Sequence, residues 1–123
     1  MTITEVSRLY DLTADTLRYY ERIGLIPPVN RKENGIRDYN EADLRWVEFI
    51  KCMRNAGIPV EVLIEYIGLE KQGEKTEHAR KELLVEQRSL LAARITEMQE
   101  TLVRLDGKIE GYERSLLLRT RES

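Results

Sequence analysis

Basic side chains gather in one short stretch near the N-terminus. Between positions 16 and 39, five Lys and Arg residues stand against three Asp and Glu, although the 123-residue chain has a formal net charge of −2. The five are Arg18, Arg22, Arg31, Lys32 and Arg37. An arginine offers a planar fork of N–H donors that fits a phosphate or the edge of a guanine. This local excess indicates binding to nucleic acid, which the overall composition does not suggest.

The chain has a single cysteine, Cys52, and a single histidine, His78. One cysteine forms no internal disulfide, and a lone thiol suits a reducing cytoplasm. Lys51 and Arg54, with Arg45 two turns earlier, would favour a reactive thiolate. The alternative is that Cys52 is a small, buried and inert core residue. A thiolate metal site needs more ligands than these, so we expect no metal and no cofactor.

Two short helices are expected first, over residues 4–11 and 14–22. Apolar residues of the first recur at i, i+3 and i+4, the spacing of one helical face. Thr13 can cap the second helix, and Gly24 can close it in a left-handed conformation. Two short helices joined by a tight turn form a helix-turn-helix pattern, which many small helical proteins also show.

A hairpin is expected directly after the second helix. Pro27 and Pro28 stop the helix, and two arms, 28–32 and 36–39, flank the residues Glu33-Asn34-Gly35. Asn-Gly is a strong hairpin signal because both residues tolerate positive φ. A basic hairpin in this place is a wing suited to phosphates, although composition alone also allows a solvated surface hairpin.

The remainder of the chain is expected to be helical. Asn40 can cap a helix over 41–56, a fourth helix covers 60–72, and residues 72–74 resemble a hinge. Apolar residues then repeat in steps of four and three along a helix over 75–118, as in a coiled coil. This seam comprises Leu91, Ile95, Met98, Leu102, Leu105, Ile109, Tyr112 and Leu116. Arg88 occupies the preceding seam position, so regular packing is expected from Leu91 onward. The predicted fold class is mainly all-α.

In this order of elements, specific residues resemble the MerR family of bacterial transcription regulators over essentially the whole chain. They are Ile3-Thr4-Glu5-Val6-Ser7, then Thr16-Leu17-Arg18-Tyr19-Tyr20-Glu21-Arg22-Ile23-Gly24-Leu25-Ile26, followed by Pro28, Arg31, Gly35, Arg37-Asp38-Tyr39 and Asp43-Leu44. The resemblance implies a winged helix-turn-helix DNA-binding domain at 1–72 and an antiparallel coiled-coil dimerisation helix at 75–118. Residues 119–123 would be a short tail.

The resemblance also implies a homodimer that binds a palindromic promoter operator. Such a dimer distorts an overlong spacer so that RNA polymerase can engage, which makes DNA deformation part of recognition. In this interpretation the second helix enters the major groove and the wing contacts phosphates. The implied DNA-binding residues are Thr16, Arg18 and Tyr19 on that helix, and Arg31, Lys32, Arg37 and Tyr39 on the wing.

Only residues 119–123 follow the long helix, so we expect no separate ligand-binding domain. A short chain with Cys52 in its third helix resembles the AdhR/NmlR-like subgroup, which senses aldehydes or other thiol-reactive stress. The resemblance implies that an electrophile modifies Cys52. A regulator that is independent of effectors, or responds to a small molecule, with a structural Cys52, is the alternative.

Two other protein classes are weighed against this one. An enzyme would need convergent titratable groups, and the sequence shows no nucleophile–base pair of recognised spacing. A coiled-coil interaction protein that does not bind DNA would explain 75–118 but not the basic stretch. No apolar run reaches the length of a membrane span, and no signal peptide is recognisable. We therefore expect a cytoplasmic regulator without a membrane partner.

Overall fold

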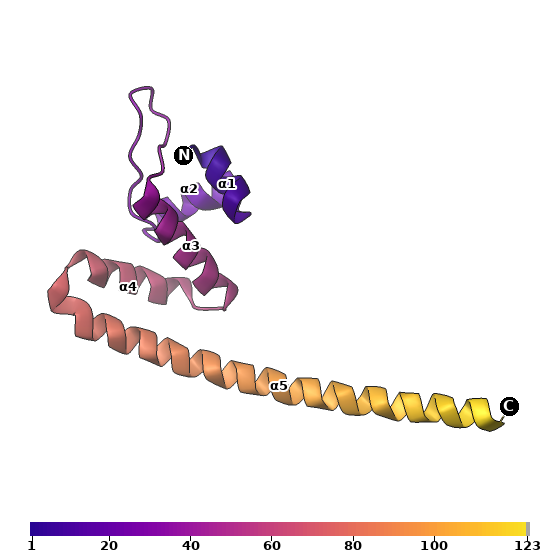
Figure 1. The fold of residues 1–123 in the computed structure, drawn as a ribbon. Coiled ribbons are helices and arrows are strands. Elements are labelled where there is room, and N and C mark those ends of the chain that lie inside the picture. The colour runs from indigo at the N-terminus through magenta and orange to yellow at the C-terminus, as the bar shows by residue number, and fades with distance from the viewer. Residues whose placement is uncertain (123) are drawn as a thin grey trace. The chain divides into compact units, whose positions relative to one another are not determined.

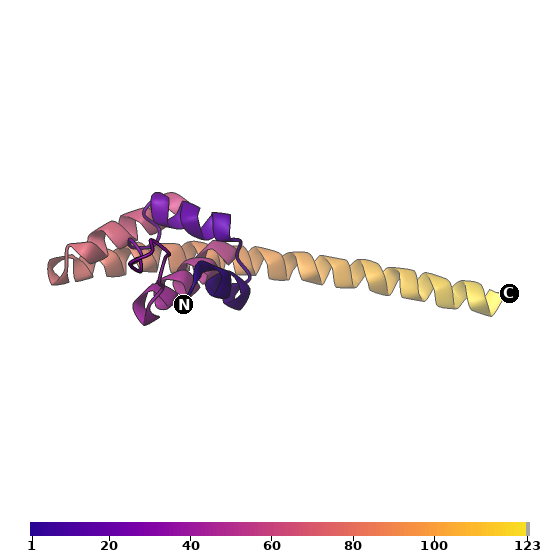
Figure 2. The same cartoon turned by 90° about the horizontal axis from the view of Figure 1, so that it is seen from above.

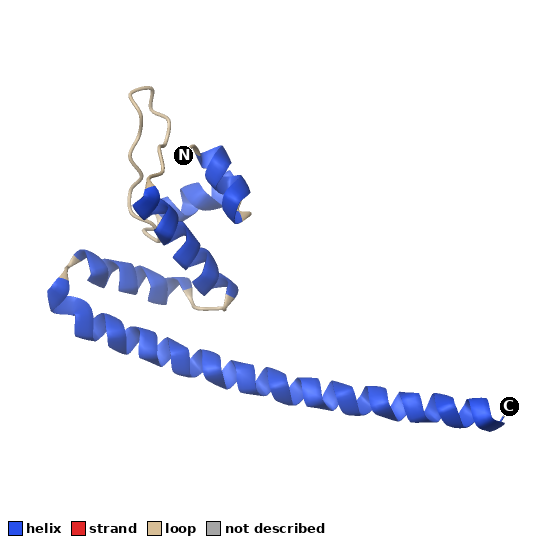
Figure 3. Cartoon of the chain, in the orientation of Figure 1, coloured by secondary structure: helices blue, strands red, loops and turns tan. Residues whose placement is uncertain are grey.

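The computed structural model describes residues 1–122, and their side chains as far as Arg121. Over these residues the chain forms α-helices and one 3-10 turn, with no strand (Figures 1 and 3). In order they are α1 (Ile3–Tyr10), α2 (Ala14–Arg22), α3 (Glu41–Asn55), α4 (Val60–Lys71), η1 (Glu74–Thr76) and α5 (Glu77–Glu122). The predicted all-α class is confirmed. The chain divides into two compact units, Met1–Leu84 and the part of α5 from Val85 onward, which are described separately.

Side-chain caps fix where the first two helices begin. The Thr2 hydroxyl accepts the Glu5 backbone N–H at 3.2 Å, and the Glu5 carboxylate accepts the Thr2 N–H at 3.0 Å. Hydrogen bonds to Thr2 lower the pKa of Glu5 because they favour its charged form. At the start of α2 the Thr13 hydroxyl accepts the Thr16 N–H at 3.1 Å. Each cap satisfies an N–H that has no partner inside the helix.

A left-handed glycine ends α2, as the sequence predicts. Gly24 has φ of +85°, a conformation that costs a residue without Cβ little. The Leu25 N–H then donates to the Tyr20 carbonyl at 2.8 Å. Leu25 and Ile26 are thereby turned into the core, where both are buried.

The wing is a narrow hairpin closed by residues 33–35. Lys32 N–H donates to the Ile36 carbonyl at 2.8 Å, and a single antiparallel bridge joins Arg31 to Arg37. Of the two turn residues expected to tolerate positive φ, Asn34 and Gly35, only Gly35 adopts it, with φ of +83°. Asn34 instead accepts the Ile36 N–H through its side-chain oxygen at 3.2 Å. The loop is therefore a turn followed by a left-handed glycine.

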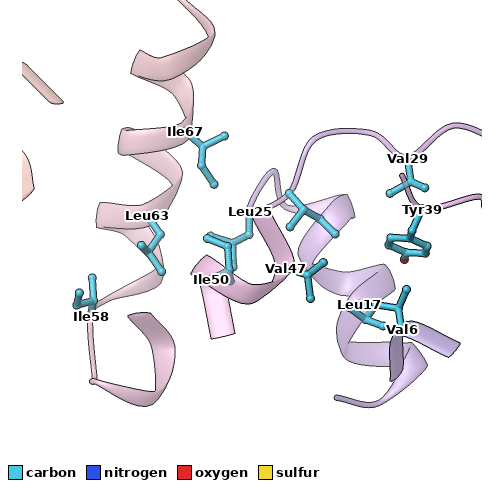
Figure 4. Packing of buried hydrophobic residues seen from close by; sticks show 11 residues of the cluster. Val6, Leu17, Leu25, Val29, Tyr39, Val47, Ile50, Ile58, Leu63 and Ile67 are labelled. Carbon is cyan, nitrogen blue, oxygen red and sulfur yellow. The ribbon is translucent and has the colours of Figure 1, made fainter. Parts of the chain in front are cut away.

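One hydrophobic core holds α1 to α4 and the base of the wing together (Figure 4). Asn40 and Asp43 form a reciprocal cap that sets the start of α3, with backbone-to-side-chain bonds of 2.8 and 2.9 Å. The core comprises Val6, Leu17, Leu25, Ile26, Val29, Tyr39, Val47, Ile50, Ile58, Leu63 and Ile67. These residues come from every element between α1 and α4, so the core orients α2 and the wing together.

The predicted hinge after α4 is an ordered turn. Gly73 adopts φ of +83°, and η1 follows directly. The buried Thr76 hydroxyl lies 2.6 Å from the Leu69 carbonyl and 2.8 Å from the Gly73 carbonyl. Arg80 donates to the Thr76 hydroxyl at 3.0 Å and to the Gly73 carbonyl at 3.2 Å. These bonds fix the turn between α4 and the start of α5.

The second unit is an uninterrupted stretch of α5 (Figure 2). Gly107 and Gly111 do not break it, and the helix runs through the predicted tail as far as Glu122. Ser123 lies outside the described residues. From Ile95 to Leu116 the seam residues are 47–71% exposed. A single helix cannot cover so long an apolar stripe. No helix in the described chain has the length and apolar character needed to cross a membrane.

Candidate nucleic-acid interface

One face of α2 is exposed and carries charged and aromatic side chains. Asp15, Arg18, Tyr19 and Arg22 recur at i, i+3, i+4 and i+7, so they lie along one face. All four are exposed, whereas Leu17 of the same helix is fully buried. The core therefore holds α2 by one side and presents the other to solvent, as groove binding requires.

The exposed side chains of α2 contact one another. The Arg18 guanidinium donates to the Asp15 carboxylate at 3.0 Å, and Arg22 lies 5.4 Å from the centre of the Tyr19 ring. The Thr13 and Thr16 hydroxyls are 2.8 Å apart. Exposed pairs of this kind contribute little to stability, so DNA can replace them at small cost. Arg22 also belongs to this face. It is part of the basic stretch in the sequence but not of the DNA-binding residues that the family resemblance implies, and its i+4 spacing from Arg18 was the signal.

The tip of the wing presents two further cations. Arg31 and Lys32 are both exposed. The Arg31 guanidinium donates to the Gly35 carbonyl at 2.9 Å, which stiffens the loop and leaves its other N–H donors available. Two of the four predicted wing residues, Arg31 and Lys32, are thus accessible to a phosphate.

Arg37 connects the wing to α2. Its Nε donates to the Glu21 carboxylate at 2.9 Å, and the two side chains are only 20% and 16% exposed. The Coulomb attraction within a pair shielded from water in this way is stronger than within a surface pair. Arg37 is therefore placed to fix the distance between the wing and α2, in contrast to the free phosphate contact that the sequence predicts.

Tyr39 lies in the core, which argues against the predicted phosphate contact in this conformation. The residue is 2% exposed, and its hydroxyl is buried without a hydrogen-bond partner among the described residues. Burial raises the pKa of Tyr39 because the phenolate would lose its hydration. Its backbone exchanges hydrogen bonds with Met1, at 2.8 and 2.9 Å. Two backbone hydrogen bonds to Met1 thus anchor the end of the wing at Tyr39.

Replacing Tyr39 with phenylalanine is expected to stabilise the protein by about 1 kcal/mol, because an unpaired buried hydroxyl carries a desolvation cost. The folded state also holds the Tyr39 proton more tightly than the unfolded state. As the pH rises above 10.0, the ordinary pKa of a tyrosine, the native protein therefore becomes less stable relative to the unfolded chain. The phenylalanine variant should lose less stability at alkaline pH than the native protein. Urea titrations at neutral and alkaline pH measure the free energy of unfolding of both. Weaker operator binding by the variant would show that the hydroxyl contacts DNA after all.

Cys52 is exposed on α3, so the expectation of a buried core cysteine is wrong for this chain. The nearby cations do not surround its thiol as the sequence suggested. The Lys51 ammonium donates to the Tyr10 carbonyl, and Arg54 donates to the Ile58 carbonyl at 2.7 Å. Both charges are thereby used to cap neighbouring backbone. Within the described residues no group of three or more His, Cys, Asp or Glu side chains could hold a metal ion.

Two family models match the chain. One, described as MerR HTH family regulatory protein, covers residues 1–68, and the other, described as MerR, DNA binding, covers residues 44–108. The chain belongs to the MerR family. It is a DNA-binding transcription regulator, and its homologues are regulators of transcription. The alternative of a coiled-coil protein that does not bind DNA is therefore wrong.

Individual MerR relatives agree with this assignment. The transcriptional regulator AdhR of Bacillus subtilis is 58% identical over 91 residues, which are 74% of this chain and 65% of AdhR. The match thus spans slightly less than two thirds of AdhR. A MerR family regulator from Listeria monocytogenes superposes with a TM-score of 0.93 at 49% identity, covering 99% of this chain and 92% of that one. HiNmlR, a MerR regulator lacking the sensor domain and solved bound to promoter DNA, gives 0.84 at 27% identity, covering 92% and 90%.

Proposed function

We propose that this MerR regulator binds a palindromic promoter operator as a homodimer. The observation that carries the proposal is the exposed basic face of α2, held by the same core that holds the wing. Two such faces related by two-fold symmetry would read two equivalent half-sites, as the symmetry of dimeric DNA-binding proteins requires.

Each interface residue receives a role that follows from its position. Thr16, Arg18 and Tyr19 face the base edges, with Arg22 supporting Tyr19 and reaching the backbone at the end of the helix. Arg31 and Lys32 contact phosphates from the wing tip. Arg37 acts as a positioning residue through Glu21, and Tyr39 packs the base of the wing.

The exposed seam of α5 supports the dimer. Residues 1–72 form the proposed DNA-binding domain and 75–118 the proposed dimerisation helix, which pairs antiparallel with a second copy. Because a narrow apolar stripe is buried when two helices pair, the exposed seam residues become the interface. The dimer works in the cytoplasm and distorts the spacer of a promoter so that RNA polymerase can engage it.

Salt dependence tests the DNA contacts. Six to ten phosphate contacts would lower affinity by about 10³ to 10⁵ between 50 and 200 mM salt, because each contact releases a counterion. Fluorescence anisotropy with a labelled operator duplex measures this slope. The double variant Arg31→Ala with Lys32→Ala should reduce the slope by about two. If the double variant leaves the slope unchanged, the wing tip does not contact phosphates.

We further propose that Cys52 senses aldehydes or other thiol-reactive compounds. Its exposure supports this, because an electrophile can reach the thiol without unfolding α3. With formaldehyde, the sulfur adds to the carbonyl carbon, the C=O π bond opens, and the thiol proton ends on the oxygen. The product is a hemithioacetal, and no other reactant is needed.

Replacing Cys52 with serine is expected to leave operator affinity unchanged and to abolish induction by formaldehyde or methylglyoxal. Serine keeps the size and exposure of the side chain but forms no comparable adduct. Anisotropy with the labelled operator duplex measures affinity, and in vitro transcription with and without the aldehyde measures induction. Ser89→Ala on α5 is the control for an exposed change elsewhere. Full induction of the serine variant would favour a regulator whose Cys52 is structural.

A further inference from the structure

A groove lined by aromatic side chains lies between α3 and α4 in the first unit. It has a volume of about 320 Å³ and is lined by Ala42, Arg45, Trp46, Phe49 and Tyr66. Pockets for small molecules generally start at about 300 Å³ and combine apolar walls with a few polar groups. The groove is thus of a size and composition that suits one small ligand.

The three rings are half-buried and packed against one another. Trp46 and Phe49 meet edge to face with centroids 6.0 Å apart, and Phe49 lies 5.7 Å from Tyr66 at 34°. This contact chain fixes the walls, since moving one ring would open a gap beside the next. A flat, conjugated molecule gains most from such a surface because it can stack against ring faces.

Arg45 supplies the only charged group of the groove. It is exposed, and among the described residues it has no hydrogen-bond or ion-pair partner. Within the described part of the chain, Glu41 and Glu48, one turn away on either side, form no ion pair with it. Its guanidinium can therefore offer two parallel N–H donors to a carboxylate, an arrangement stronger than a neutral hydrogen bond.

The groove and Cys52 share one face of α3. Positions 45, 49 and 52 follow the i, i+4, i+7 spacing, and about 10 Å of helix separates the first from the last. We propose that the groove binds planar conjugated carbonyl compounds that carry an acidic group, and so selects electrophiles for Cys52. The acid pairs with Arg45, the ring stacks on the aromatic walls, and the carbonyl carbon points along α3 toward the thiol. The selection step rests on the proposed sensing role of Cys52.

Binding without reaction is measured in the full chain carrying Cys52→Ser. Trp46 is the only tryptophan, so its indole N–H resonance reports on the groove alone. Titration with 4-formylcinnamate, a flat aldehyde with a carboxylate at its far end, should shift this resonance saturably. Arg45→Ala should weaken that binding about tenfold while leaving cinnamaldehyde, which lacks the acid, unaffected. Arg104→Ala, an exposed arginine on α5, is the matched control.

Absence of a saturable shift would overturn the proposal and indicate that a second copy covers the groove or that it is too shallow. An equal loss for both aldehydes in the Arg45 variant would also overturn it, because Arg45 would then support the walls. In the native chain, the rate of Cys52 modification should level off with 4-formylcinnamate and stay linear with formaldehyde. If Cys52 is no sensor, the Cys52→Ser variant keeps full induction while the indole shift persists, so the two proposals fail separately.

Discussion

Replacing Arg18 with alanine should weaken binding to the operator by about 1–3 kcal/mol, or roughly five- to 150-fold. Arg18 is exposed at the centre of the outer face of α2, and its one ion pair among the described residues is with Asp15, at 3.0 Å. A bidentate contact from an arginine to a guanine edge is lost completely in alanine. The expected loss is confined to the operator, and binding to random duplex should weaken much less. Anisotropy titrations against both duplexes measure the difference.

Two further variants distinguish a contact of Arg18 with a base from a general electrostatic attraction to phosphates. Asp15→Asn frees Arg18 from its ion pair and should strengthen operator binding slightly, because no pair has to break. Arg8→Ala removes an exposed arginine from α1 and should change affinity little. If Arg18→Ala weakens both duplexes equally, Arg18 holds a phosphate and sequence is read elsewhere.

The double substitution Leu102→Lys with Leu105→Lys should abolish the dimer. These side chains are 58% and 55% exposed in the single chain and would be buried in the proposed seam. An unpaired charge buried at an interface costs on the order of 3–5 kcal/mol. Loss of the second binding domain should then lower operator affinity about 100-fold or more, since bivalent binding is lost. Sedimentation equilibrium and anisotropy measure the two effects.

Val103→Lys is the matched control for the seam. Val103 is 69% exposed, between the two leucines, but lies off the heptad positions. A lysine there should leave both the dimer and operator affinity intact. Dissociation by this variant as well would mean that the interface is not the predicted stripe.

Local signals in the sequence predicted most of the fold. Thr13, Asn40 and Gly24 set helix ends through groups within a few residues of each other, so short-range chemistry determines the boundaries. The hairpin loop was placed at residues 33–35 for the same reason. The exposed face of α2 was also predictable, because buried and exposed positions alternate with the helical period.

Contacts between distant residues escaped prediction. The Arg37–Glu21 pair joins wing and α2 across sixteen positions, and no spacing rule connects them. Tyr39 lies in a polar, basic segment that suggests exposure, yet it is inside the core. Lys51 and Arg54 looked like partners of the Cys52 thiol because they are neighbours in sequence. In the fold their charges reach backbone carbonyls instead.

Selection of bound sequences from a random duplex library tests the central claim most directly. The full chain, as a homodimer, should enrich an inverted repeat whose two half-sites are equivalent, because two α2 faces related by a two-fold axis read them. Enrichment of a single unrepeated site, or no enrichment, would contradict a dimer that recognises DNA through Thr16, Arg18 and Tyr19.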